Sequence, residues 1–259
     1  MIDLKSAHDF AVNLAKQAGA IARNYYNQSI AFQPKSDNSP VTEADIEINR
    51  LVIQECTKQY PDVGILGEEE SSARVSEWLW VCDPIDGTIP YVLGIQASTF
   101  CLALVHDGEP VVGVVYDFLN GRLYSAIKGN GAWLNGAPLV PSTTPPLKAV
   151  NLEVWQEEHL SGDFREKLFA AGFITTQFAS NTFMGMATAT GRVAATVYAG
   201  PYAWDMAAAK VIAEELGCVV TDLDGKDQRY DDNINGGVIF HPAYAKELQL
   251  LLSGARRRL

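Results

Sequence analysis

The chain has 259 residues, 47% of them hydrophobic and 20% charged, so it can bury a substantial core and is not a disordered chain. A formal net charge of −11 excludes the broad cationic surface by which nucleic-acid-binding and anionic-membrane-binding proteins recognise phosphate. No apolar run has the length of a membrane span and residues 1–5 show no secretory signal pattern, so we expect a cytoplasmic protein with neither nucleic-acid nor membrane partners.

The four cysteines are scattered along the chain and form no C-x-x-C pair. That spacing gives no support to a metal-binding or redox motif. We therefore expect buried structural thiols in a reducing compartment.

The first half of the chain predicts two helices and then a sheet. Apolar residues recur at three- and four-residue intervals over 3–26, which is typical of an amphipathic helix, and a second helix is predicted from Thr42 to Cys56. Asp-Gly and Asn-Gly turns separate the apolar runs 98–105, 110–117 and 122–127, and these turns predict an antiparallel meander. The predicted strands are 63–66, 78–82, 98–105, 110–117 and 122–127.

The second half alternates between strand and helix patterns, which favours layered helices and sheets. Residues 141–146, rich in proline, serine and threonine, form the one linker-like stretch. We therefore expect a single domain, 1–259, with an N-terminal lobe of about 1–145 and a C-terminal lobe of about 146–259. The predicted strands are 148–155, 173–178, 192–199, 218–221 and 236–240, and the predicted helices are 160–171, 181–190, 203–216 and 242–252.

The stretch 83–88, DPIDGT, follows the strand predicted at 78–82. Pro84 and Gly87 are expected to end that strand, and a tight turn can point both carboxylates and the Ile85 carbonyl at one place. Oxygen ligands of this kind suit Mg²⁺, and free N–H groups after the turn would bind phosphate. An Asx turn with a helix cap explains the same residues, and the motif alone leaves the two interpretations equally open.

Other acids are ambiguous in the same way. The run 68–70, EEE, follows a predicted strand, and such a run is usually a solvated loop. Asp205 precedes an alanine-rich helix, where an acid is favoured by the helix dipole, and Asp45 lies at the third position of a capping box begun by Thr42. Each can instead be a metal ligand or orient a catalytic group. Lys35 neutralises phosphate or is a plain loop lysine.

The segment 219–225, VVTDLDG, is similar to the start of a haloacid-dehalogenase-type phosphatase. That family has threonine or valine where Lys226 stands, and too little chain follows for its later motifs. We therefore expect a surface turn here. Covalent catalysis through Asp224 has little support in the residues, and no serine or cysteine sits in a nucleophile-elbow pattern.

Three ordered motifs, GEE at 67–69, DPIDGT at 83–88 and WD at 204–205, resemble the inositol monophosphatase family in identity, order and approximate spacing. The likeness covers nearly the whole chain, including Lys35 and VTEAD at 41–45. It implies a mixed α/β (α+β) fold, the layered α-β-α-β-α sandwich of the inositol monophosphatase and fructose-1,6-bisphosphatase type. It also implies a homodimer, lithium sensitivity and two or three Mg²⁺ ions per subunit.

Carried over by position, the resemblance assigns three sets of site residues. The metal ligands are Glu68, Asp83, the Ile85 carbonyl, Asp86 and Asp205. The catalytic residues are Glu68, Thr88 and Asp45, the last two helping to deprotonate the attacking water. Phosphate and substrate contacts are Gly87, Thr88, Asp86, Ser180, Tyr198 and Asp205, with Lys35 and Glu69 in support.

This sequence departs from the family pattern in its substrate-binding parts. Ile89 and Pro90 follow Thr88 where Thr-Asn is usual, Tyr198 replaces a glutamate that touches the inositol ring, and Ala179 replaces a glycine before Ser180. The resemblance implies a Mg²⁺-dependent phosphomonoesterase for a small polyol or sugar phosphate, inositol monophosphate first, acting by direct attack of metal-activated water. Histidinol phosphate, fructose 1,6-bisphosphate and 3′-phosphoadenosine nucleotides are alternatives. A member that binds metal and phosphate without turnover is the non-catalytic alternative.

Overall fold

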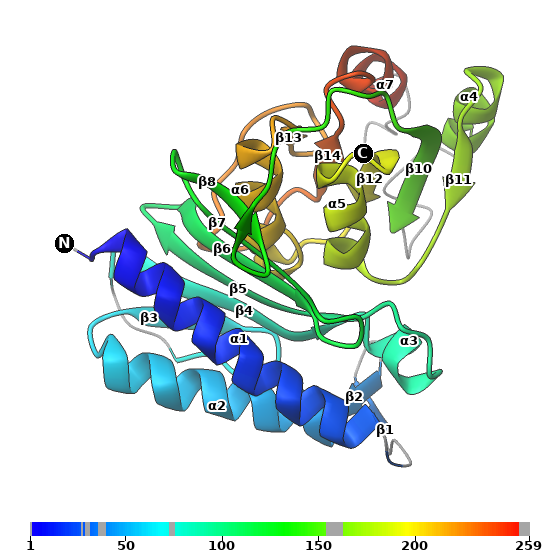
Figure 1. Cartoon of the computed structure of the whole chain (residues 1–259). Coiled ribbons are helices and arrows are strands. Elements are labelled where there is room, and N and C mark those ends of the chain that lie inside the picture. Colours follow the sequence, from blue (N-terminus) through cyan, green and yellow to red (C-terminus); the bar gives the residue numbers. More distant parts are fainter. Residues whose placement is uncertain are drawn as a thin grey trace.

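A computed structural model describes residues 2–26, 28, 32–35, 40–72, 76–153 and 163–253. In these residues two β-sheets alternate with three layers of helices, in the order α-β-α-β-α (Figure 1). The predicted fold class is therefore confirmed. The last two residues of the strand predicted at 148–155 and the first three of the helix predicted at 160–171 lie outside the described residues.

The first sheet has seven strands in the order β3-β4-β5-β6-β7-β8-β9. β3 pairs in parallel with β4, and the remaining neighbours are antiparallel, which confirms the predicted meander. The strands are β3 (Gly64–Gly67), β4 (Trp78–Asp86), β5 (Thr99–His106), β6 (Glu109–Asp117), β7 (Arg122–Ile127), β8 (Gly131–Leu134) and β9 (Ala137–Pro138).

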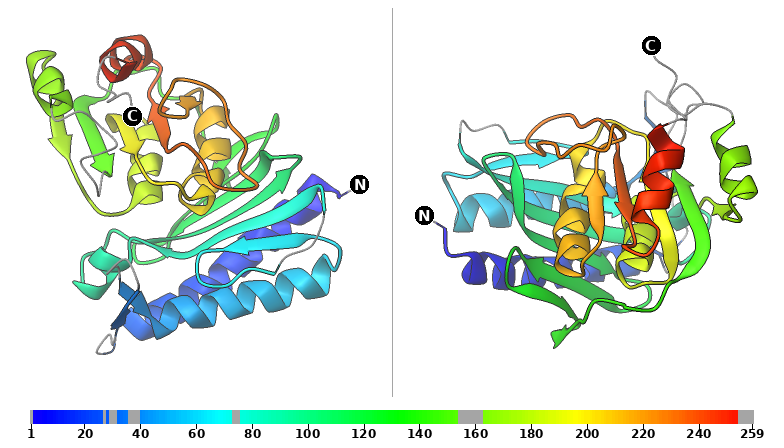
Figure 2. Two further views of the ribbon diagram at one scale, coloured as in Figure 1. Left: turned by 180° about the vertical axis from the view of Figure 1, so that it is seen from behind. Right: turned by 90° about the horizontal axis from the view of Figure 1, so that it is seen from above.

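Helices α1 (Leu4–Tyr26) and α2 (Glu43–Gln59) lie side by side against one face of this sheet (Figure 2). The buried face of α1 is rich in alanine, including Ala7, Ala11 and Ala18, which lets the helix approach the sheet closely. A short hairpin, β1 (Phe32–Pro34) with β2 (Pro40–Thr42), precedes α2. Thr42 caps α2, and its side chain and that of Asp45 form a capping box, as the sequence suggests.

The second sheet has five strands in the order β11-β10-β12-β14-β13. β10 is parallel to both β11 and β12, whereas β14 is antiparallel to its neighbours. Helices α4 (Phe164–Ala170) and α7 (Ala245–Ser253) cover its outer face (Figures 1 and 2). The strands are β10 (Leu147–Glu153), β11 (Ile174–Thr176), β12 (Val193–Tyr198), β13 (Val219–Thr221) and β14 (Gly237–Phe240). The two-lobe division near residue 145 stays a prediction.

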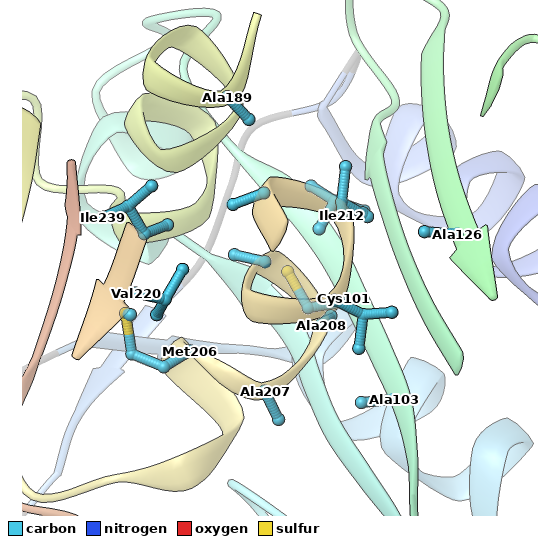
Figure 3. Close-up of a cluster of buried hydrophobic side chains, with 14 of the residues drawn as sticks. Cys101, Ala103, Ala126, Ala189, Met206, Ala207, Ala208, Ile212, Val220 and Ile239 are labelled. Atoms are coloured by element: carbon cyan, nitrogen blue, oxygen red, sulfur yellow. The ribbon is translucent and has the colours of Figure 1, made fainter. Parts of the chain in front are cut away.

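Helices α5 (Asn181–Ala189) and α6 (Ala207–Glu215) lie between the two sheets. Figure 3 shows α6 with Ala207 and Ala208, and with Val220 and Ile239 of the second sheet close by. The approach to the first sheet is so close that a Cβ at Gly113 would lie 2.4 Å from the carbonyl oxygen of Ala208. This middle layer therefore fixes the two sheets relative to each other.

Two predicted elements differ from the structure. β4 continues through Pro84 to Asp86 instead of ending at 82, and it does so because its pairing with β5 is interrupted between Asp83 and Asp86. Proline lacks an N–H group, so it is tolerated where the ladder is already broken. The helix predicted at 203–216 is also interrupted: a short 3₁₀ turn, η1 (Ala203–Asp205), is separated from α6 by Met206. This break places Asp205 in its own turn.

The four cysteines are all buried and free of disulfides, which confirms the expectation of structural thiols. None of the helices in the described part of the chain is long and apolar enough to span a membrane.

Candidate active site

Three carboxylates from two segments meet at the end of β4. Asp83 and Asp86 belong to β4 and Asp205 ends η1, and each offers an oxygen within 4.8 Å of the other two. Asp83 and Asp86 are buried, with 2% and 4% of their surface exposed. The structure thus brings together the motifs at 83–88 and 204–205, which lie more than a hundred residues apart in the sequence.

The electrostatics of this cluster call for a cation. Burial raises the pKa of both Asp83 and Asp205 well above its ordinary value, and repulsion from neighbouring carboxylates, including Glu68 and Asp86, adds to the effect. The Oδ1 atom of Asp83 is buried and has no hydrogen-bond partner. A divalent cation would satisfy that oxygen and offset the repulsion, and carboxylate oxygens are the ligands that Mg²⁺ prefers. These residues therefore fit a Mg²⁺ site.

Asp86 is held by the segment that begins α5. Its Oδ2 accepts hydrogen bonds from Ser180 Oγ at 2.6 Å and Thr182 N at 2.8 Å, and its Oδ1 accepts one from Asn181 N at 3.0 Å. The hydroxyls of Thr182 and Thr99 also donate to Oδ2. Of these five donor groups, only the Ser180 hydroxyl belongs to a residue predicted from the sequence. A serine before a helix signals free N–H groups, but nothing local indicates that their acceptor lies 94 or more residues away.

Asp205 accepts a hydrogen bond from Tyr198 at the end of β12. The phenolic oxygen lies 2.5 Å from Asp205 Oδ2, and the tyrosine side chain is buried. The side chain of Asn181 also hydrogen-bonds Asp205. Tyr198 and Ser180, predicted as substrate contacts, therefore both touch site carboxylates.

The acidic run that follows β3 is anchored by a lysine. Lys35 Nζ lies 2.7 Å from Glu68 Oε1 and 2.5 Å from Glu69 Oε1. Burial by itself would lower the pKa of Lys35, but the two carboxylates outweigh it and raise that pKa. Glu68 in turn lies close enough to Asp83 to raise its pKa. The first two glutamates are thus part of the charged site and not a plain solvated loop.

Gly87 turns the chain from β4 into α3 (Thr88–Val92), a short helix that includes Ile89 and Pro90. Its φ of 85° is left-handed, and a Cβ there would lie 2.8 Å from Ser180 Cβ and 2.9 Å from the Ala97 carbonyl oxygen. The hydroxyl of Thr88 donates to the Ile85 carbonyl at 3.2 Å. Only glycine therefore allows this close approach of the turn to Ser180.

Asp45 is fully buried at the start of α2. Its Oδ2 accepts hydrogen bonds from the backbone and side chain of Thr42, while its Oδ1 has no partner. Burial raises the pKa of Asp45 to about 7, because the charged form is poorly solvated there. Within the residues that the structure describes, no hydrogen bond joins it to Thr88, so the predicted pairing of these two residues stays a prediction.

The segment 219–225 is strand β13 followed by the expected turn. Asp222 Oδ1 accepts hydrogen bonds from the backbone N–H groups of Asp224 and Lys226 at 2.8 Å each. Asp222 thus organises a loop after β13, which leaves the aspartyl nucleophile reading without structural support.

A five-layer sandwich with a triad of carboxylates at a strand end, two of them buried and one half-buried, defines the class of protein. The chain belongs to the inositol monophosphatase family, whose model matches residues 3–257. It is therefore a phosphatase of the inositol monophosphatase superfamily, with Mg²⁺ as its metal.

Curated relatives within this family carry different names. The chain is 30% identical over 237 residues to the Nus factor SuhB of Xylella fastidiosa, covering 88% of this chain and 86% of the relative. It is 30% identical over 228 residues to a histidinol-phosphatase of Chlorobaculum parvum (85% and 87% covered). It is 31% identical over 221 residues to the fructose-1,6-bisphosphatase/inositol-1-monophosphatase of Thermotoga maritima (85% and 86% covered).

Solved structures share the whole fold. An IMPase/NADP phosphatase complexed with Mg²⁺ and phosphate superposes with a TM-score of 0.86 at 25% identity, covering 99% of each chain. A staphylococcal inositol monophosphatase, solved as an inhibitory complex soaked in lithium chloride, superposes with a TM-score of 0.85 at 25% identity, covering 97% of this chain and 96% of the other.

Proposed function

We propose that the chain hydrolyses a small polyol or sugar phosphomonoester, with inositol monophosphate as the first candidate. The observation that carries this proposal is the meeting of Asp83, Asp86 and Asp205, with an unpartnered buried oxygen on Asp83. Membership of the inositol monophosphatase family supports it.

In this proposal Glu68, Asp83 and the Ile85 carbonyl hold one Mg²⁺, and Asp83, Asp86 and Asp205 hold a second. Bound Mg²⁺ supplies a Lewis acid that activates water and stabilises developing negative charge. Lys35 supports the first set, because its ion pairs with Glu68 and Glu69 hold these side chains at the site.

The remaining residues bind phosphate and move a proton. The N–H groups of Gly87 and Thr88 are proposed to hold phosphate oxygens, because these two residues form the turn from the end of β4 into α3. Asp45, with a pKa raised to about 7, is suited to accept a proton near neutral pH. Thr88 would relay the proton from the attacking water to Asp45. Because water attacks the phosphate directly, no covalent enzyme intermediate is required.

The identity of the leaving group, the alcohol that carries the phosphate, has several candidates. Relatives of nearly equal identity are named for histidinol phosphate, for fructose 1,6-bisphosphate together with inositol 1-phosphate, and, at 34% identity over 127 residues, for 3′(2′),5′-bisphosphate nucleotides. These substrates are the alternatives. A non-catalytic metal- and phosphate-binding role is the alternative of another class, and the Ile89-Pro90 sequence after Thr88 is the feature that leaves it open.

A panel of phosphomonoesters with and without Mg²⁺ tests the proposal. We expect phosphate release only with Mg²⁺ and the highest kcat/KM for inositol monophosphate, because discrimination between substrates lies in that ratio. Asp86→Asn should abolish release, and Asp224→Asn, in the turn after β13, is the matched control that should not. If the wild-type protein hydrolysed no member of the panel, the non-catalytic role would be favoured. If Asp224→Asn were inactive and a phosphoenzyme could be trapped, covalent catalysis would be favoured.

A homodimer, a cytoplasmic location and inhibition by lithium belong to the same proposal. They rest on the family resemblance and, for lithium, on the staphylococcal neighbour. Sedimentation equilibrium and activity in lithium chloride test the first and the last.

A further inference from the structure

Glu153 ends β10 and is a buried carboxylate that the proposed chemistry does not use. Only 1% of its surface is exposed. Its Oε1 accepts three hydrogen bonds, each 2.9 Å long, from Asn151 Nδ2, Phe178 N and Ala179 N. Its Oε2 is buried without a partner. Burying such a charge is costly, so the contacts that it makes must be important for the local structure.

The two backbone contacts fix a segment that has no strand or helix of its own. Residues 177–180 connect β11 to α5, and Ala179 adopts a left-handed backbone with φ of 58°. A non-glycine residue in that conformation is held there by its surroundings. The amides of Phe178 and Ala179 both donate to the same oxygen of Glu153, and these two hydrogen bonds hold the backbone in that conformation. Glu153 is thus the acceptor that determines where Ser180 begins α5.

The same segment supplies most of the hydrogen bonds to Asp86. Ser180 Oγ, Asn181 N and Thr182 N follow directly after Ala179, and all three donate to the Asp86 carboxylate. Glu153 also pairs with Tyr198 across the β10–β12 ladder, and its carbonyl oxygen accepts a hydrogen bond from Ala199 N at 3.1 Å. One residue of the second sheet therefore contacts both the segment that binds Asp86 of β4 and the strand end that binds Asp205 of η1.

We propose that Glu153 is a positioning residue: its carboxylate holds the 178–182 segment in the geometry in which that segment binds and orients Asp86. This inference rests on the proposed metal role of Asp86. Loss of the acceptor would release the amides of Phe178 and Ala179, and Asp86 would lose its fixed orientation. Contacts of this kind behind a metal ligand are typically worth about 10- to 100-fold in metal affinity.

The test uses two substitutions that differ only in reach and charge. Glu153→Asp keeps the charge but shortens the side chain, so its oxygens no longer reach the two amides. Glu153→Gln keeps the acceptor at the same distance without the charge. Thr176→Val is the matched control, because Thr176 donates to Asn151 at 3.2 Å in the same sheet but contacts neither the 178–182 segment nor Asp86.

Two measurements are made on each full-length variant: Mg²⁺ affinity by titration calorimetry and amide exchange of Phe178 and Ala179 by NMR. We expect Glu153→Asp to weaken Mg²⁺ binding about tenfold and to speed exchange at both amides, with Glu153→Gln and Thr176→Val within about twofold of wild type. Unchanged Mg²⁺ affinity in Glu153→Asp, or an equal loss in Glu153→Gln, would overturn the inference. A wild-type protein that bound no Mg²⁺ would instead overturn the proposed function, and amide exchange would still report on Glu153.

Discussion

Tyr198 donates its phenolic hydrogen to Asp205 Oδ2 across 2.5 Å, joining the end of β12 to the turn η1. The hydroxyl is enclosed: a Cβ at Gly200 would lie 2.2 Å from it, and the amide of Tyr202 points at it from 3.3 Å. The family resemblance places at this position a glutamate that touches the inositol ring. In this chain the position is a donor turned toward a site carboxylate, so it supports Asp205.

Replacing Tyr198 with phenylalanine removes that hydrogen bond and the weaker one that the hydroxyl accepts from the Tyr202 amide. We expect Mg²⁺ affinity to fall about tenfold, because Asp205 loses the donor that fixes its orientation. Titration calorimetry measures the effect, and thermal unfolding in EDTA reports on stability. Tyr230→Phe is the control, since that buried tyrosine contacts Gln228 and not the site. Equal Mg²⁺ affinity in wild type and Tyr198→Phe would show that Asp205 does not need this donor.

Asp83→Asn should stabilise the metal-free protein and abolish its response to Mg²⁺. The carboxylate is buried among like charges, which raises its pKa because the charged form is disfavoured there, and the neutral amide avoids that cost. Replacing a buried charge by a neutral group of similar shape gains roughly 1–3 kcal/mol. Guanidinium unfolding at pH 8, in EDTA and then in excess Mg²⁺, measures both effects. A variant less stable than wild type in EDTA would contradict the argument.

Asp45 should make the stability of the metal-free protein fall as the pH rises. Its pKa is about 7 in the folded protein, against an ordinary value of 3.8, because burial disfavours the charge. Between these values the folded state keeps a proton that the unfolded chain has released, so the contribution of this group to stability is complete below pH 4 and is lost as the pH rises through 7. Asp45→Asn should therefore gain stability relative to wild type between pH 4 and pH 8.

Urea unfolding in EDTA across that pH range checks this expectation. A difference between Asp45→Asn and wild type that stays constant with pH would show that Asp45 titrates near its ordinary value in the folded protein.

Gly87→Ala should impair the site far more than Gly94→Ala. Both glycines have positive φ, 85° and 74°, so both substitutions pay about 1–2 kcal/mol for a left-handed backbone. Only at Gly87 would the new Cβ also meet other atoms, the closest being Ser180 Cβ, whereas nothing lies within 4 Å at Gly94. We expect at least about a tenfold loss of phosphate release for Gly87→Ala alone. Comparable losses in both variants would mean that backbone strain, and not the contact with Ser180, limits the site.

The sequence by itself determined the local structure and the chemical types at the site. Periodicity gave α1 and α2, Asp-Gly and Asn-Gly turns gave the meander of β5 to β7, and the motif of Asp83 to Thr88 indicated metal and phosphate. These features can be predicted from the sequence because they depend on residues that lie only a few positions apart.

Only the tertiary structure decided how the site is held. The continuation of β4 through Pro84 depends on a break in its pairing with β5, and the donors to Asp86 come from a helix start 94 or more residues away. Tyr198 and Glu153 acquire their roles from cross-strand packing that no local pattern encodes. Such contacts are non-local, so their partners become known only when the two sheets close around α5 and α6.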